Sequence, residues 1–148
     1  MQILSNTLAF VFSLGVIVFV HESGHYLVAK AFGVRVLTFS LGFGRSLWSM
    51  KRGDTDYRLC WVPLGGYVTF AGQDPSERSS NPRDYPNQAR WRRVLILVAG
   101  PAMNVVLAIV LVTVVFATGV AVGDPGQLPA VLGAVEEGGA AQRSGLQT

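Results

Sequence analysis

Two long uncharged stretches and a charged segment between them divide the chain. Residues 1–20 contain no charged side chain, and the apolar character continues, interrupted by one His-Glu pair, to residue 29. A second uncharged run covers residues 94–122. A bilayer core needs about 20 apolar residues to cross, and in lipid the backbone must satisfy its own hydrogen bonds. We therefore predict two transmembrane helices, at 1–30 and 94–122.

The first run invites a second interpretation, a secretory signal peptide. Such a peptide has a basic start, a shorter apolar stretch and a small-residue cleavage site. The run has no Lys or Arg before position 30 and is too long for an apolar signal region. The pattern therefore favours a helix that stays in the membrane.

The segment between the runs has the pattern of short strands. Four stretches are rich in β-branched and aromatic residues, and glycine or proline separates them, as between strands of a sheet. These stretches are Val34–Ser40, Ser46–Arg52, Thr55–Val62 and Gly66–Ala71. We expect a β-hairpin or small sheet here, followed by a polar loop.

Charge places this β-rich segment on one side of the membrane. The 148 residues include 12 Lys and Arg against 9 Asp and Glu, and only 14% of residues are charged, compared with about 25% in soluble domains. Eleven of the basic residues lie between Lys30 and Arg93 with five acidic ones, a net charge of +6. Basic residues near membrane ends stay in the cytoplasm. The segment 31–93 is therefore predicted to be cytoplasmic, and both termini external.

The remaining composition excludes several classes of protein. A single cysteine, Cys60, excludes an internal disulfide framework and a cysteine-based zinc finger. The overall charge of +3 is too small to indicate nucleic acid as a partner. We interpret Arg90, Arg92 and Arg93, with Trp91 at headgroup level, as an anchor to the lipid bilayer.

The polar pair inside the first apolar run belongs to an H-E-x-x-H motif, His21-Glu22-Ser23-Gly24-His25. On a helix, positions i and i+4 share a face, so both imidazoles can bind one Zn²⁺, while Glu22 can act as general base on a water. The pattern also arises by chance in surface helices. Here the motif contains both histidines of the chain and lies at the inner end of a membrane helix, where ionisable groups are expensive and usually functional.

Four motifs, in this order, resemble those of the site-2 protease family, zinc metalloproteases that act within membranes. They are HESGH from His21, FSLGFG from Phe39, VPLGGYV from Val62 and AGPAMN from Ala99. The chain is most similar to the bacterial regulator-of-sigma-E protease branch. The resemblance implies that His21 and His25 are zinc ligands and that Glu22 is catalytic.

The resemblance also implies a substrate site in the β-rich segment, where an extended substrate strand would pair with a strand edge. Gly65, Gly66 and Tyr67 are the candidate substrate contacts. The residues alone equally allow Gly65-Gly66 to be a tight turn between strands.

The fourth motif, with Gly100, Pro101 and Asn104, is interpreted as mainly structural. Small residues and amides commonly pack membrane helices together. Pro101 is expected either to kink the second helix or to lie in its first turn, and Asn104 is expected to hydrogen-bond a neighbouring helix.

The end of the chain, 123–148, resembles the opening of a PDZ domain without its remaining strands and helices. Family members take a third zinc ligand, an aspartate, from a later transmembrane helix, and the acidic residues after Val122 do not lie in an apolar run. A catalytic zinc normally has three protein ligands. We therefore expect the N-terminal part of a longer protease, inactive by itself.

The predicted fold class is a polytopic α-helical membrane protein, with two transmembrane helices flanking a cytoplasmic membrane-associated β-hairpin or sheet region and the start of a PDZ domain. The predicted function is zinc-dependent cleavage of transmembrane protein substrates in the bacterial inner membrane, and the resemblance implies an anti-sigma factor or a remnant signal peptide as the substrate. PDZ-linked gating of the substrate is expected in the whole protein. The alternative is a non-catalytic membrane scaffold or substrate-binding module.

Overall fold

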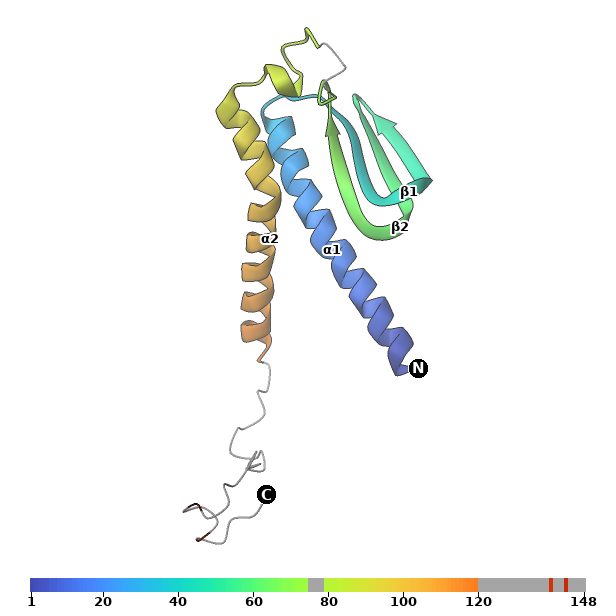
Figure 1. The fold of residues 1–148 in the computed structure, drawn as a ribbon, viewed down its shortest axis with the longest axis vertical. Coiled ribbons are helices and arrows are strands. Elements are labelled where there is room, and N and C mark those ends of the chain that lie inside the picture. The colour runs from blue at the N-terminus through green and yellow to red at the C-terminus, as the bar shows by residue number, and fades with distance from the viewer. Residues whose placement is uncertain (75–78, 120–138, 140–142, 144–148) are drawn as a thin grey trace. The chain divides into compact units, whose positions relative to one another are not determined.

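Two long helices and one β-hairpin make up the part of the chain that the structure, a computed structural model, describes: residues 1–74, 79–119, 139 and 143. Helix α1 covers Gln2–Ala31, strands β1 and β2 cover Val36–Arg52 and Thr55–Phe70, and helix α2 covers Arg90–Thr118. A 3-10 turn, η1, at Tyr85–Asn87 precedes α2. In Figure 1, α1 lies between α2 and the hairpin.

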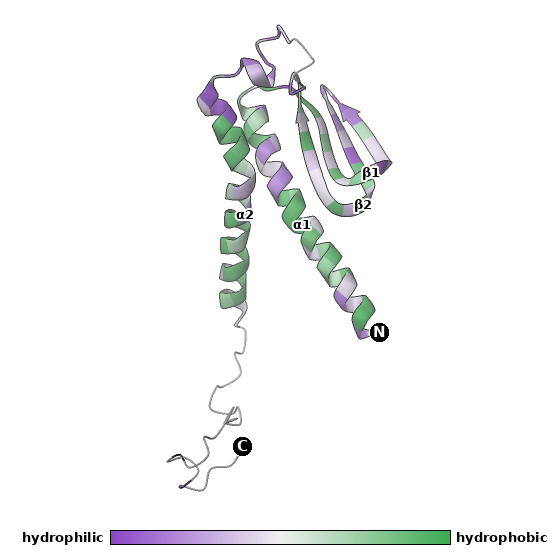
Figure 2. Ribbon diagram, in the orientation of Figure 1, coloured by the Kyte–Doolittle hydropathy of each residue, from purple (hydrophilic) through white to green (hydrophobic). Residues whose placement is uncertain are grey.

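Both helices are long and apolar enough to cross a membrane. Their most apolar windows have mean hydropathies of 2.3 in α1 and 2.6 in α2, and most of their large apolar side chains are exposed within the described chain. Figure 2 shows hydrophobic residues along most of α2 and a hydrophilic first turn. Apolar surface of this extent is stable only against lipid or other apolar surfaces.

The prediction of four short strands is wrong in its boundaries, because the structure has two long ones. Gly42 and Gly44 have φ values of 85° and 84°, which glycine adopts without a Cβ penalty, so β1 bends there instead of ending. β2 continues through Pro63 and Gly65. Gly53, with φ of 61°, makes the tight turn between the strands.

The bends fold the antiparallel hairpin back on itself. Residues 46–52 pair with 55–60, and residues 36–41 pair with 66–70. Residues 38–41 also pair with residues 56–59. In this stretch the residue numbers increase in the same direction along both segments, whereas in the rest of the register they increase in opposite directions. The first half of β1 therefore lies between the two halves of β2, and 66–70 forms an edge that is paired on one side among the described residues.

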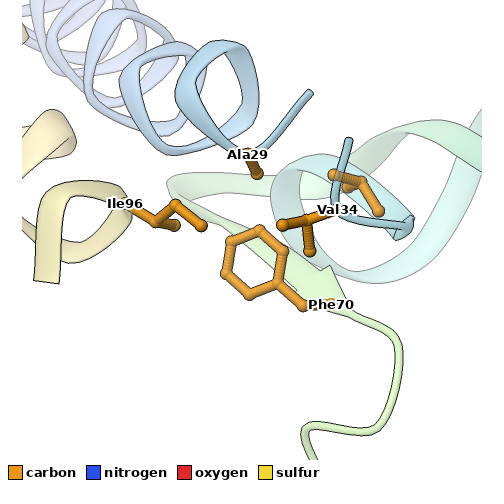
Figure 3. Packing of buried hydrophobic residues seen from close by; sticks show 5 residues of the cluster. Ala29, Val34, Phe70 and Ile96 are labelled. Carbon is orange, nitrogen blue, oxygen red and sulfur yellow. The ribbon is translucent and has the colours of Figure 1, made fainter. Parts of the chain in front are cut away.

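A small core joins the C-terminal end of α1 and the N-terminal part of α2 to the hairpin. Its members are fully or almost fully buried apolar side chains, four of which are labelled in Figure 3. They are Ala29, Val34, Val36, Phe70 and Ile96. They come from α1, the linker after it, both strands and α2, so one cluster fixes all four elements relative to each other.

The predictions for residues 123–148 concern the chain beyond α2. The segment 123–148, predicted to begin a PDZ domain, lies outside the described residues, apart from positions 139 and 143. The division of the chain into the segments 1–30, 31–93, 94–122 and 123–148 remains a prediction. Pro101 lies in the interior of α2 and not in its first turn, because α2 begins at Arg90 and not at residue 94.

A partly buried ion pair connects the loop before α2 to the start of the hairpin. Arg35 Nε donates to Asp84 Oδ1 at 2.7 Å, and the Asp84 side chain is only 3% exposed. Ser79 Oγ donates to the other carboxylate oxygen. The hydrogen bonds from Arg35 and then from Ser79 hold the pKa of Asp84 below its ordinary value.

This lowered pKa predicts how stability depends on pH. A carboxylate with a folded pKa below its unfolded value, about 3.9, stabilises the fold above that pH and loses the contribution as acid protonates it. We expect Asp84→Asn to lower the thermal stability of the purified protein at pH 7. The difference from wild type should shrink as the pH falls below about 4.

The matched control is Asp54→Asn, which removes an exposed carboxylate 3.8 Å from Arg83 Nη2. Thermal unfolding in detergent between pH 3 and 7 measures both variants. A wild-type advantage over Asp84→Asn that stays constant across this range would contradict the account.

Candidate metal and catalytic site

The two histidines of the H-E-x-x-H motif lie side by side on one face of α1. Their Nε2 atoms are 3.2 Å apart, and their rings meet edge to face with centroids 4.9 Å apart. The i, i+4 spacing on a continuous helix produces this proximity. Neutral imidazoles at this separation either share one proton or direct two lone pairs at one cation.

The far nitrogen of each imidazole is held by α2. His25 Nδ1 is 2.7 Å from the backbone carbonyl oxygen of Ile96. A carbonyl can only accept, so His25 carries its proton on Nδ1 and keeps a lone pair on Nε2. This is the arrangement of a metal-binding histidine, whose other nitrogen donates to a carbonyl or carboxylate.

The second histidine meets Asn104. The Asn104 amide nitrogen lies 3.1 Å from His21 Nδ1, so the expected hydrogen bond from Asn104 to a neighbouring helix is formed. Asn104 Oδ1 is buried and has no hydrogen-bond partner among the described residues. A half-turn of the amide would bring Oδ1 onto His21 Nδ1–H and would leave the lone pair of His21 Nε2 free.

Glycines allow α2 to approach the histidines. A Cβ added to Gly100 would collide with the His25 ring and lie 2.8 Å from His21 Nε2. A Cβ on Gly24 would collide with the backbone carbonyl of Ala99. Gly100 therefore packs on the imidazoles and Gly24 on the α2 backbone, and both positions exclude any larger residue.

Glu22 and one edge of the hairpin share a pocket with His21. This pocket has a volume of about 270 Å³. It is lined by Ile17, Val18, His21, Glu22, Phe43, Leu64, Gly65, Gly66 and Asn104. His21 and Glu22 therefore share this pocket with two of the three predicted substrate contacts, Gly65 and Gly66, whereas His25 is not part of its lining.

Gly66 in particular has no room for a side chain. A Cβ there would lie 2.7 Å from the Ser40 carbonyl oxygen and 3.1 Å from Glu22 Cγ. Tyr67, the third predicted contact, is not part of the pocket lining and stacks on Phe43 with centroids 6.2 Å apart. The roles of all these residues remain predictions.

Two parts of the site could not be predicted from the sequence. The Ile96 carbonyl is a backbone group, so no residue type signals its role. Phe43 lies within the FSLGFG motif, and its ring covers Gly65 and lines the pocket, but an aromatic residue between glycines in a strand gives no distinct signal of its own.

The described residues contain no group of three or more His, Cys, Asp and Glu side chains placed to hold a metal ion. His21 and His25 provide two ligands with suitable geometry. Two nitrogens bound to a tetrahedral zinc at about 2.0–2.1 Å would be about 3.3 Å apart, close to the 3.2 Å seen here.

Comparison with known proteins places the chain in a family. Peptidase family M50 matches residues 9–143. A protein of Neisseria meningitidis described as a candidate zinc metalloprotease is 39% identical over 143 residues, covering 95% of this chain and 31% of its own length. The zinc metalloprotease Rip1 of Mycobacterium tuberculosis is 38% identical over 115 residues, covering 76% of this chain and 28% of its own length.

This chain spans about a third of the length of the curated relatives it matches. The match to the family extends from α1 through α2 and includes the H-E-x-x-H motif and the pocket built around it. Combined with two helices able to cross a membrane, it makes the chain part of an integral membrane protein. The chain belongs to Peptidase family M50, the site-2 protease family of metalloproteases.

Proposed function

We propose that this chain provides the zinc-binding and general-base part of an intramembrane endopeptidase. One observation carries the proposal: the Nε2 atoms of His21 and His25 converge at 3.2 Å while α2 holds their Nδ1 atoms, and Glu22 lines the same pocket. The printed names of the relatives, zinc metalloproteases, support the choice of metal.

The residues present fit zinc as two of its ligands. A zinc ion held by His21 and His25 would lower the pKa of a water toward about 7 and polarise the scissile carbonyl. A half-turn of the Asn104 amide would support this state, because it would bring the orphaned Oδ1 onto His21 Nδ1 as the acceptor that a metal-binding histidine needs. The third ligand is proposed to come from another part of the whole protein.

In this mechanism Glu22 takes the proton from the attacking water and passes it to the leaving amine. Its neighbours have distinct tasks. The Ile96 carbonyl keeps His25 in the tautomer that binds with Nε2, and the Gly100 hydrogen atom leaves the space that the two rings fill. The apolar lining from α1 and the hairpin limits the water that reaches the pocket.

The hairpin edge is proposed to hold the substrate. A peptide bond inside a transmembrane helix is already hydrogen-bonded and shielded, so the substrate must unwind before attack. Residues 66–70 are paired on one side among the described residues, and Gly66 lies beside Glu22 without an intervening side chain. An extended substrate backbone pairing with this edge would bring its carbonyl next to the general base.

The proposed substrates are transmembrane proteins, anti-sigma factors among them, in the bacterial inner membrane. PDZ-linked gating of substrate entry is part of the same proposal for the whole protein. The alternative, a membrane scaffold that binds such proteins without cleaving them, would use the same hairpin edge and needs no general base.

The first test replaces Glu22 with Gln in the whole protein as expressed in cells. We expect cleavage of a model transmembrane substrate to fall by at least about 100-fold, the usual contribution of general acid-base catalysis, while bound zinc is retained. Ser23→Ala is the control, because Ser23 is the next residue and lines a different cavity, with Tyr26 and Tyr57. Cleavage by Glu22→Gln at the wild-type rate, or uncleaved substrate in the wild type, would sink the enzymatic assignment.

A second test adds one methyl group at Gly100. The Cβ of Gly100→Ala would push the histidine rings apart, so we expect zinc affinity to fall by at least about tenfold, comparable to the loss of a residue that hydrogen-bonds a metal ligand. In the control, Gly15→Ala, the Cβ meets nothing within 4 Å, and zinc affinity should not change. Competition with a chelator measures both, and equal affinities would contradict the packing described here.

A third test concerns orientation, which we propose from the +6 charge between Lys30 and Arg93. A reporter fused after Gly72 should read as cytoplasmic, and one fused after Gly126 as external. The opposite pair of readings would overturn the proposed topology.

A further inference from the structure

The cytoplasmic end of α1 and the start of α2 form a basic and aromatic patch, here called the junction patch: Lys30, Phe32, Trp91, Arg92 and Arg93. The Phe32 and Trp91 rings meet edge to face with centroids 5.4 Å apart. The Arg92 guanidinium carbon lies 5.6 Å from the Phe32 centroid and 5.3 Å from that of Trp91. Aromatic faces thus hold this cation in a defined position.

The arginines of the junction patch have donors without acceptors. The Nε atoms of Arg92 and Arg93 are buried and have no hydrogen-bond partner among the described residues. Arg92 Nη1 donates to Gln88 Oε1 at 3.2 Å. Unpaired buried donors are unfavourable, and charged ones more so, unless an acceptor is supplied.

Among the described residues, neither the first turn of α2 nor Asp84 supplies that acceptor. The first turn of α2 contains no acidic residue. Asp84, in the preceding loop, is engaged by Arg35 and Ser79. The partial positive charge at the start of a 29-residue helix adds to the positive charge of the arginines. The junction patch therefore favours an anion that approaches from outside the described chain.

We propose that the junction patch binds the phosphate of an anionic phospholipid. Two features favour a lipid over a soluble anion. The apolar part of α2 begins at Val94, directly after Arg93, which puts the arginines at headgroup depth, and Trp91 is 56% exposed beside them. Basic pockets between membrane helices on the cytoplasmic side bind anionic headgroups in this way.

The chemistry of the contact is that of a guanidinium with a phosphate. Planar guanidinium groups bind phosphate oxygens through paired, charge-assisted hydrogen bonds, which Arg92 and Arg93 would form with the headgroup phosphate. The bound lipid would also hold α1 to α2 through the Phe32–Trp91 contact. This binding requires neither zinc nor catalysis, so its test is independent of the proposed function.

The experiment titrates the purified, delipidated protein in a neutral detergent with phosphatidylglycerol and follows the melting temperature. Phosphatidylglycerol should raise it saturably, while phosphatidylcholine and inorganic phosphate should not. At about 1 kcal/mol per basic residue near the membrane surface, Arg92→Gln combined with Arg93→Gln should weaken the apparent affinity roughly 30-fold. The control, Arg45→Gln with Lys51→Gln, removes the same charge from exposed hairpin positions and should leave the affinity unchanged.

Each of the following results would overturn the proposal. Equal stabilisation by phosphatidylcholine would remove the need for an anion, and equal stabilisation by inorganic phosphate would show a site for a free anion. An equal loss of affinity in both double variants would show general surface charge. If the Arg92/Arg93 double variant does not fold, Arg93→Gln alone keeps the Arg92 contacts with both rings and should weaken binding about fivefold, and an unchanged affinity would overturn the proposal.

Discussion

The hydrogen bond from the His25 imidazole to the Ile96 carbonyl is the interaction on which the site depends. Ile96 has two roles, because its carbonyl oxygen holds His25 while its fully buried side chain packs with Ala29, Val34 and Phe70. The same residue of α2 thus connects the metal-binding histidine to the core that joins helices and hairpin. A shift of α2 along α1 would disturb the core and the histidine tautomer together.

The fold-back of the hairpin provides the second constraint. Because β1 and β2 bend instead of ending, the last part of β2 becomes an edge beside α1, and Gly66 lies next to Glu22. Each close approach in the site is made by a glycine: Gly24 against the α2 backbone, Gly100 against the imidazoles and Gly66 against Glu22. The polar site can therefore lie between tightly packed elements at the end of two apolar helices.

Much of this arrangement could be predicted from local pattern. The two uncharged runs predict α1 and α2, and the i, i+4 spacing predicts that His21 and His25 meet. The pairing of two long bent strands could not be predicted, because glycines such as Gly42 and Gly44 occur both where a strand ends and where a strand bends and continues. The sequence predicts that Asn104 hydrogen-bonds a neighbouring helix, but it does not identify His21 as the partner. That contact depends on the position along α1 at which α2 packs, which no local pattern encodes.

The central claim is that His21 and His25 bind one zinc ion through Nε2, and zinc X-ray absorption of the whole protein tests it most directly. The account predicts nitrogen and oxygen scatterers only, including two imidazoles at about 2.0–2.1 Å, and the loss of one imidazole contribution in His25→Ala. A sulfur scatterer at about 2.3 Å, or an unchanged imidazole signal in His25→Ala, would contradict it.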